Sequence, residues 1–166
     1  MASSEPVDYR PLLRLLTEAG VEFVVIGGVA GVMYGSPIPT FDVDIAIVRR
    51  RETLEKLVAV LAPLAPRPRG MPNNLPFIFD EQTLRSSSVL TLTTTLGDLD
   101  ILSEPAGVDS VDGLLARAQL ADMETFTLRV AALDDLIAMK RAANREKDQN
   151  PLEYLEALKA AGEEQL

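Results

Sequence analysis

The sequence contains no cysteine and no histidine among its 166 residues. The absence of cysteine excludes disulfides, thiolate metal sites, cysteine nucleophiles and thiol redox chemistry. The absence of histidine excludes a Ser-His-Asp triad, an HExxH zinc site and a histidine general base. Any proton transfer near neutral pH therefore falls to carboxylates, Lys, Tyr, a metal-bound water or the substrate. Any metal must be a hard ion bound by oxygen, which points to Mg²⁺ or Mn²⁺.

Positive charge is also scarce, because 25 acidic residues outnumber 16 basic ones and the formal net charge is -9. Such a surface repels nucleic-acid backbones and anionic membranes unless basic side chains cluster locally. The most apolar stretch, Phe23 to Tyr34, is too short for a transmembrane helix and is interrupted by glycines. The N-terminal MASSEPVDYR lacks the basic and apolar regions of a signal peptide. We therefore expect a soluble cytoplasmic protein without a membrane partner.

The length predicts one domain over residues 1–166, and an apolar content of 47% is sufficient for a core. Hydrophobic spacing predicts helices over 7–19, 29–34, 51–62, 111–119, 133–143 and 151–161. Strands are expected over 23–26, 41–48, 77–79 and 126–130, with a hairpin of 88–95 and 98–102 turning at Leu96-Gly97 and a loop over 62–76. This order indicates an α/β (α+β) fold in which helices flank a mixed, twisted sheet. The core would span about 20–130 and the C-terminal helices about 131–162.

Two Asp-x-Asp sequences fall in predicted strands. Because alternate strand residues share a face, Asp42 and Asp44 lie on one face, and the other face can pack into the core through Phe41, Val43, Ile45 and Ile47. Asp98 and Asp100 repeat the pattern. Paired carboxylates repel one another unless a divalent cation neutralises them, and a third carboxylate from a neighbouring strand would complete an oxygen cage. A single Asp-x-Asp more often marks an exposed strand end, but the preceding Gly-Gly turn favours a metal site for Asp42 and Asp44.

The sequence Val25-Ile26-Gly27-Gly28-Val29-Ala30 leads a buried strand directly into a helix. Glycine permits a tight turn and the close approach of a ligand, and a helix N-terminus favours phosphate. The GxGxxG and GxxxxGK[ST] motifs do not fit, since Ile26 stands where glycine is needed and no Gly-Lys occurs. The alternative is that the spacing of Gly27, Gly31 and Gly35 serves close helix packing.

These residues together resemble a known family motif. Ile26-Gly27-Gly28, a short helix and then Thr40-Phe41-Asp42-Val43-Asp44-Ile45 are similar to the hG[G/S] and Dh[D/E]h signature of the DNA polymerase β-like nucleotidyltransferase superfamily. Within it, the chain resembles the small bacterial nucleotidyltransferases related to toxin–antitoxin and abortive-infection enzymes. Leu99-Asp100-Ile101-Leu102 matches the third carboxylate of the family. Leu133 to Lys140, with Arg145, Lys147 and Asp148, resembles its C-terminal helical segment, so the resemblance covers most of the chain from Glu22 onward.

The resemblance implies transfer of a nucleoside monophosphate from an NTP, such as ATP, to an acceptor hydroxyl, with release of pyrophosphate. It implies that Asp42, Asp44 and Asp100 hold Mg²⁺ (or Mn²⁺), with Asp100 as the candidate base. It further places Gly27, Gly28 and Thr40 at the nucleotide phosphates, and Lys140 and Arg145 near the triphosphate or the acceptor. The alternative for the two basic residues is a solvated helix face tied to Asp148 and Glu146.

One position departs from the family pattern, because Ile38 stands where members often carry Arg two residues before the Thr. The run Arg49-Arg50-Arg51 either compensates for this loss or forms a solvated turn, and the second interpretation is favoured. The acceptor stays open among a protein, a small molecule and a tRNA; net charge disfavours the tRNA and suits a cationic, aminoglycoside-type molecule. A cognate toxin or antitoxin protein is an expected partner. The alternative function is a weak or inactive partner module of the same fold, acting as an antitoxin or scaffold.

Overall fold

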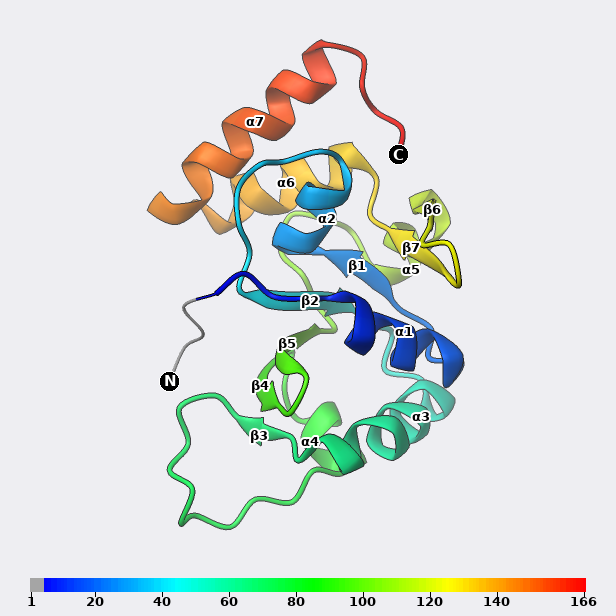
Figure 1. Ribbon diagram of the computed structural model, residues 1–166, viewed down its shortest axis with the longest axis vertical. Helices are drawn as coiled ribbons and strands as arrows, with labels where there is room; N and C mark the ends of the chain where they lie inside the picture. The colour runs from blue at the N-terminus through cyan, green and yellow to red at the C-terminus, as the bar shows by residue number, and fades with distance from the viewer. Residues whose placement is uncertain (1–4) are drawn as a thin grey trace.

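The alternating apolar segments assemble into one seven-stranded mixed sheet in the computed structural model, which describes residues 5–166 (Figure 1). The strand order is β3-β4-β5-β2-β1-β7-β6. At its centre, β2 runs parallel to β5 and antiparallel to β1, and β1 runs parallel to β7. The strands are β1 (Val24–Ile26), β2 (Asp42–Ala46), β3 (Arg67–Pro68), β4 (Val89–Thr94), β5 (Gly97–Leu102), β6 (Gln119–Asp122) and β7 (Thr127–Val130).

Helices cover both sides of this sheet, which confirms the expected mixed α/β architecture (Figure 1). Two helices near the C-terminus, α6 and α7, pack against each other and against α2 at the top of the figure. On the other side, α1 and α3 contact each other. The helices are α1 (Arg10–Glu18), α2 (Gly27–Met33), α3 (Arg51–Leu61), α4 (Glu81–Arg85), α5 (Val111–Arg117), α6 (Leu133–Ala143) and α7 (Gln149–Ala160), with 3-10 turns η1 (Ala62–Leu64) and η2 (Glu146–Asp148).

The hydrophobic core packs against one face of β2 and β5. Val43 and Ile45 of β2 and Leu99 of β5 are completely buried. The apolar stripes of α1 and α3 join the same cluster, so that the helices cover the apolar face through residues such as Leu13 and Leu57. Burial of each such side chain stabilises the fold by about 1.5–3 kcal/mol. Because strand side chains alternate, this packing turns the acidic residues of β2 and β5 to the opposite face.

Several sequence-based expectations are wrong in detail. Residues 77–79 do not form a strand, whereas the short strands β3 and β6 and the helix α4 were not expected. The segment over 62–76 is a loop only in part, because it contains η1 and β3. Phe41 precedes β2 and is 43% exposed, so it does not share the core with Val43. The hairpin is correct, and its turn lies at Thr95-Leu96, since Thr94 pairs with Gly97.

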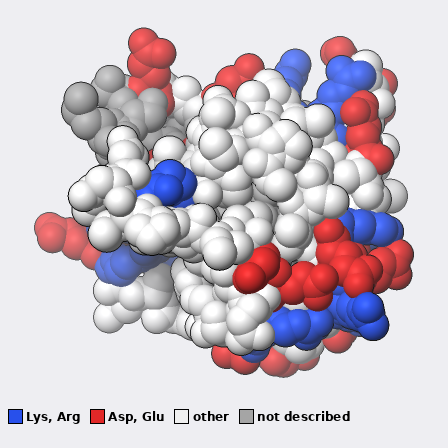
Figure 2. Space-filling view, turned by 90° about the horizontal axis from the view of Figure 1, so that it is seen from below, with Lys and Arg blue, Asp and Glu red and all other residues white. Residues whose placement is uncertain are grey.

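The end of the molecule that carries β3 and α4 has an uneven distribution of charge. Figure 2 shows this end from below: its central part is almost free of charged side chains, and acidic and basic groups gather on the right, the side on which α3 lies in Figure 1. The segment from Met71 to Phe79 contains no charged residue. Over residues 5–166, none of the helices has the length and apolar character needed to cross a membrane.

Candidate active site

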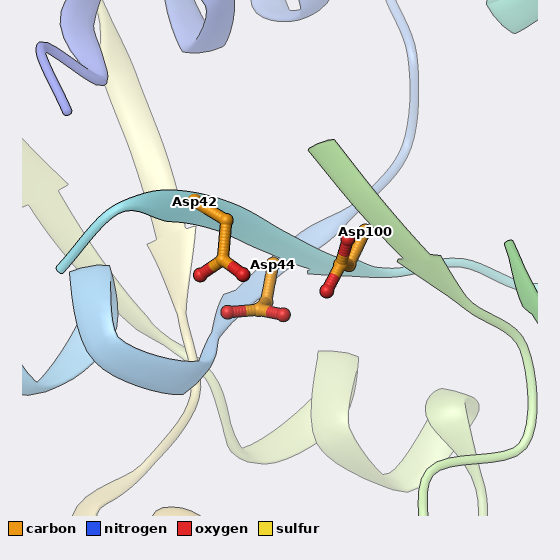
Figure 3. Close-up of side chains that lie close together, drawn as sticks. All are labelled: Asp42, Asp44 and Asp100. Carbon is orange, nitrogen blue, oxygen red and sulfur yellow. The ribbon is translucent and has the colours of Figure 1, made fainter. Parts of the chain in front are cut away.

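Three carboxylates converge on the polar face of β2 and β5. In the parallel register of these strands, Asp42 pairs with Asp98 and Asp44 pairs with Asp100. Asp42, Asp44 and Asp100 each offer a carboxylate oxygen within 4.8 Å of the others, and Figure 3 shows the three side chains on one side of the strands. The predicted sharing of a face is therefore correct, and strand pairing places the third carboxylate beside the first two.

The electrostatics of this acidic cluster favour a cation. Burial, followed by repulsion from Asp42 and Asp100, raises the pKa of Asp44 to about 7. Burial also raises the pKa of Asp100, although the neighbouring Arg69 opposes this shift. A divalent cation would relieve the repulsion, because carboxylate oxygens are the ligands that Mg²⁺ and Mn²⁺ prefer. The donor set thus fits the metal that the sequence predicts.

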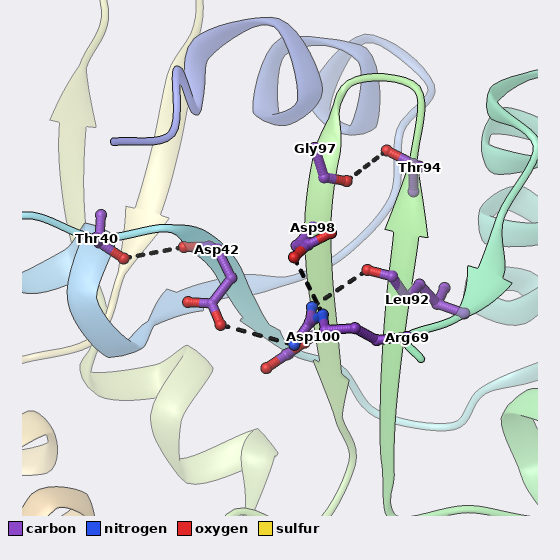
Figure 4. A network of polar contacts seen from close by, with 8 residues as sticks. All are labelled: Thr40, Asp42, Arg69, Leu92, Thr94, Gly97, Asp98 and Asp100. Carbon is purple, nitrogen blue, oxygen red and sulfur yellow. Dashed lines mark hydrogen bonds and ion pairs between the residues drawn. The ribbon is translucent and has the colours of Figure 1, made fainter. Parts of the chain in front are cut away.

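Arg69, which sequence reasoning missed, connects the carboxylates of the site (Figure 4). Its Nη2 lies 2.6 Å from Asp100 Oδ1, its Nε lies 3.2 Å from Asp98 Oδ2, and its Nη1 lies 3.8 Å from Asp42 Oδ2. Nη2 also donates to the carbonyl oxygen of Leu92 at 3.2 Å. Asp98 therefore contacts the guanidinium, and Asp100 contacts both the guanidinium and the acidic cluster. Arg69 directly follows β3, whose two-residue length leaves no periodic signal in the sequence.

The glycines at the start of α2 allow the chain to pass closely against the acidic strand. Gly27 has a φ of +67°, and a Cβ there would lie 2.3 Å from Asp44 Oδ2. A Cβ at Gly28 would lie 2.6 Å from Thr40 Oγ1. The Thr40 hydroxyl donates to the carbonyl oxygen of Asp42 at 3.1 Å (Figure 4). Only glycine meets both demands at position 27, namely a left-handed backbone and the absence of a side chain.

Two basic side chains share one buried carboxylate at the edge of the site. Lys140 Nζ lies 2.8 Å from Asp148 Oδ1, and Arg145 Nε lies 2.6 Å from Asp148 Oδ2. Burial opposes ionisation of Asp148, but the hydrogen bonds from Arg145 and Lys140 outweigh it and lower the pKa of this carboxyl. The link to Asp148 that one interpretation expected is present, and the attraction between Lys140 and Asp44 offsets part of the rise in the pKa of Asp44.

All eight residues singled out from the sequence line one cavity of about 350 Å³. They are Gly27, Gly28, Thr40, Asp42, Asp44, Asp100, Lys140 and Arg145. Ile38 lines the same cavity.

The Arg49-Arg50-Arg51 run makes ion pairs outside this cavity. Arg49 contacts Glu104, Arg50 contacts Glu22 and Asp112, and Arg51 contacts Glu55, all with exposed or half-buried side chains. The arginine run is therefore not positioned to replace the guanidinium that the family often carries at position 38.

Comparison with solved structures identifies the fold. The chain is similar to LnuA, a lincosamide antibiotic adenylyltransferase solved with lincomycin bound, with a TM-score of 0.63 and 15% identity over 93% of this chain and 99% of that chain. The chain has a nucleotidyltransferase fold. Two further similar structures are a candidate nucleotidyltransferase from Thermotoga maritima (TM-score 0.49, 13% identity, 98% of both chains) and JHP933 from Helicobacter pylori (TM-score 0.47, 15% identity, 93% of this chain and 67% of that chain). No protein-family model matches the sequence, and no curated protein matches it.

The nucleotidyltransferase fold agrees with the superfamily resemblance of the sequence motifs. The narrower resemblance to toxin–antitoxin and abortive-infection enzymes stays a prediction, as does the assignment of a role to each site residue.

Proposed function

We propose that this protein transfers a nucleoside monophosphate from an NTP to an acceptor hydroxyl. The observation that carries the proposal is the convergence of Asp42, Asp44 and Asp100 beside the Gly27-Gly28 turn. The acceptor oxygen forms a bond to the α-phosphorus, the bond from that phosphorus to the bridging oxygen breaks, and pyrophosphate leaves. Magnesium or manganese, when bound at the three carboxylates, would neutralise charge on the phosphoryl oxygens.

Several backbone and side-chain groups of this protein would position the nucleotide and the acceptor. The Gly27-Gly28 turn lines the cavity and would present backbone N–H groups to the β- and γ-phosphates, with Thr40 beside them. Lys140 and Arg145 supply positive charge at the edge of the same cavity. Asp100 takes the proton of the acceptor hydroxyl, since its second oxygen is not held by Arg69. Phosphoryl transfer depends mainly on positioning and charge stabilisation, so it is compatible with a chain that lacks His and Cys.

The comparison with LnuA supports a small-molecule acceptor, because LnuA is named as an adenylyltransferase of an antibiotic. ATP is the corresponding first choice among the nucleotides. A toxin–antitoxin role and a cytoplasmic location remain predictions from the sequence.

Isothermal titration calorimetry with each NTP tests the proposal. Binding should require Mg²⁺ or Mn²⁺ and should be lost in the double variant Asp42→Ala, Asp44→Ala. The matched control is Asp109→Ala, Asp112→Ala, which removes two carboxylates from exposed positions and changes the net charge equally. Unchanged NTP binding in the first variant, or equal loss in the control, would contradict the proposal.

A further inference from the structure

A second, larger cavity also borders the acidic cluster. It has a volume of about 470 Å³ and shares with the first cavity the residues Gly27, Asp44, Asp100, Lys140, Arg145 and Leu155. This volume lies within the range of about 300–1,000 Å³ that is usual for pockets binding small molecules. The two cavities therefore meet at the carboxylates, and a molecule in each would place its reactive end at the same point.

The walls of the larger cavity are mainly apolar. Along the sheet, Leu102 of β5 pairs with Val89 of β4, two pairs beyond the Asp100–Thr91 pair and therefore on the same face. The opposite wall is formed by α6, which contributes apolar side chains such as Leu136 and Met139. The cavity is thus polar at the end that holds Asp44 and Asp100 and apolar along the rest of its length.

Four of the five charged residues that line the larger cavity already have ion-pair partners, and the fifth, Asp44, belongs to the proposed metal site. Glu104 contacts Arg49 at 2.8 Å, and Asp100 contacts Arg69 at 2.6 Å. Lys140 and Arg145 both contact Asp148. A polycationic acceptor would require free carboxylates along the walls, and a nucleic acid would require free cations. Outside the proposed metal site this lining meets neither demand, whereas an uncharged ligand leaves every one of these ion pairs intact.

We propose that the larger cavity binds an uncharged, amphipathic small molecule whose hydroxyl lies at the carboxylate end. This assignment rests on the proposed function, and it names the acceptor class of the same reaction. The apolar part of the acceptor packs between β4, β5 and α6, and its hydroxyl reaches Asp100. The cationic, aminoglycoside-type acceptor suggested by the acidic surface is disfavoured, because the carboxylates on these walls are either ion-paired or part of the proposed metal site.

Binding of the uncharged, apolar dye Nile red measures the cavity directly, without requiring turnover. The full chain should bind the dye, and n-octyl glucoside, an uncharged amphiphile with hydroxyls, should displace it below its micelle concentration. Tobramycin, a polycationic amino-sugar, should not. Val89→Glu is the test variant: Val89 is 47% exposed, so the fold should tolerate the change, and the added carboxylate should weaken dye binding roughly tenfold or more.

Leu120→Glu is the matched control, because Leu120 is also an exposed apolar strand residue but lines a different cavity of about 270 Å³. The proposal is overturned if the dye does not bind, if Leu120→Glu weakens binding as much as Val89→Glu, or if tobramycin displaces the dye. Metal-dependent ATP binding, measured on the same samples, separates the two proposals. If the protein does not bind ATP in the presence of metal but binds and releases the dye as expected, nucleotidyl transfer is rejected and the amphiphile site is supported.

Discussion

Replacing Gly27 with alanine tests whether close contact with the acidic strand is essential. An alanine Cβ would lie 2.3 Å from Asp44 Oδ2, 2.7 Å from its Cγ and 2.9 Å from its Cβ, whereas ordinary contacts begin at 3.4 Å. The oxygen would have to retreat by about 1.1 Å to reach an ordinary contact distance. Asp44 belongs to a strand that is paired on both sides, so its backbone cannot move away easily.

The expected destabilisation has two parts. The left-handed backbone costs an alanine about 1–2 kcal/mol, and the overpacking against Asp44 adds about 1–3 kcal/mol. Gly20→Ala is the control, because Gly20 has a similar φ of +74° and its Cβ would meet only the end of Lys56, at 3.4 Å. Urea unfolding should therefore show about 1–2 kcal/mol lost in Gly20→Ala and clearly more in Gly27→Ala.

The same variants separate the site from the stability of the fold. Metal ligands must lie within about 0.2 Å of their preferred distances, so the displaced Asp44 should weaken Mn²⁺ binding by about tenfold or more in Gly27→Ala, with no change in Gly20→Ala. In an Asp44→Ala background, the stability cost of Gly27→Ala should become smaller, because the two nearest atoms are gone. Equal stability losses in the two glycine variants, with unchanged Mn²⁺ affinity, would refute this account.

Three further predictions concern the charged groups of the site. Since the pKa of Asp44 is raised from 3.8 to about 7, the metal-free fold should lose stability as the pH rises through about 7. For the same reason Mn²⁺ should release a proton when it binds, and it should bind more tightly at pH 8 than at pH 6. Calorimetry in two buffers that shows no proton release would contradict this prediction. Arg69→Lys should cost about 1–3 kcal/mol of unfolding free energy, because an ammonium cannot reach three carboxylates, whereas Arg14→Lys at an exposed pair should change little in the same urea titration. Asp148→Asn should lower the free energy of unfolding by about 1–3 kcal/mol at pH 7. Because the pKa of Asp148 is lowered in the folded protein, this contribution should vanish as the pH falls through that pKa. A difference in stability from wild type that persists at acid pH would reject the ion-pair explanation.

The sequence contained enough to predict the local parts of the site. The two-residue period of a strand places Asp42 and Asp44 on one face whatever the strand pairs with, and the same holds for Asp98 and Asp100. The double glycine after a buried strand marked the tight turn into α2. These features depend on neighbours within a few residues, and they are the ones that the structure reproduces.

Other features required the folded chain. Asp98 and Asp100 have the same local pattern, and only the parallel register of β5 with β2 decides that Asp100 joins the acidic cluster while Asp98 faces Arg69. Arg69 lies far from both in the sequence and reaches them because β3 pairs with the edge of β4. The apolar cavity likewise needs α6 to lie over the end of β4 and β5. Strand register and contacts between distant segments arise from packing of the whole core. The spacing of residues within one segment therefore does not predict them.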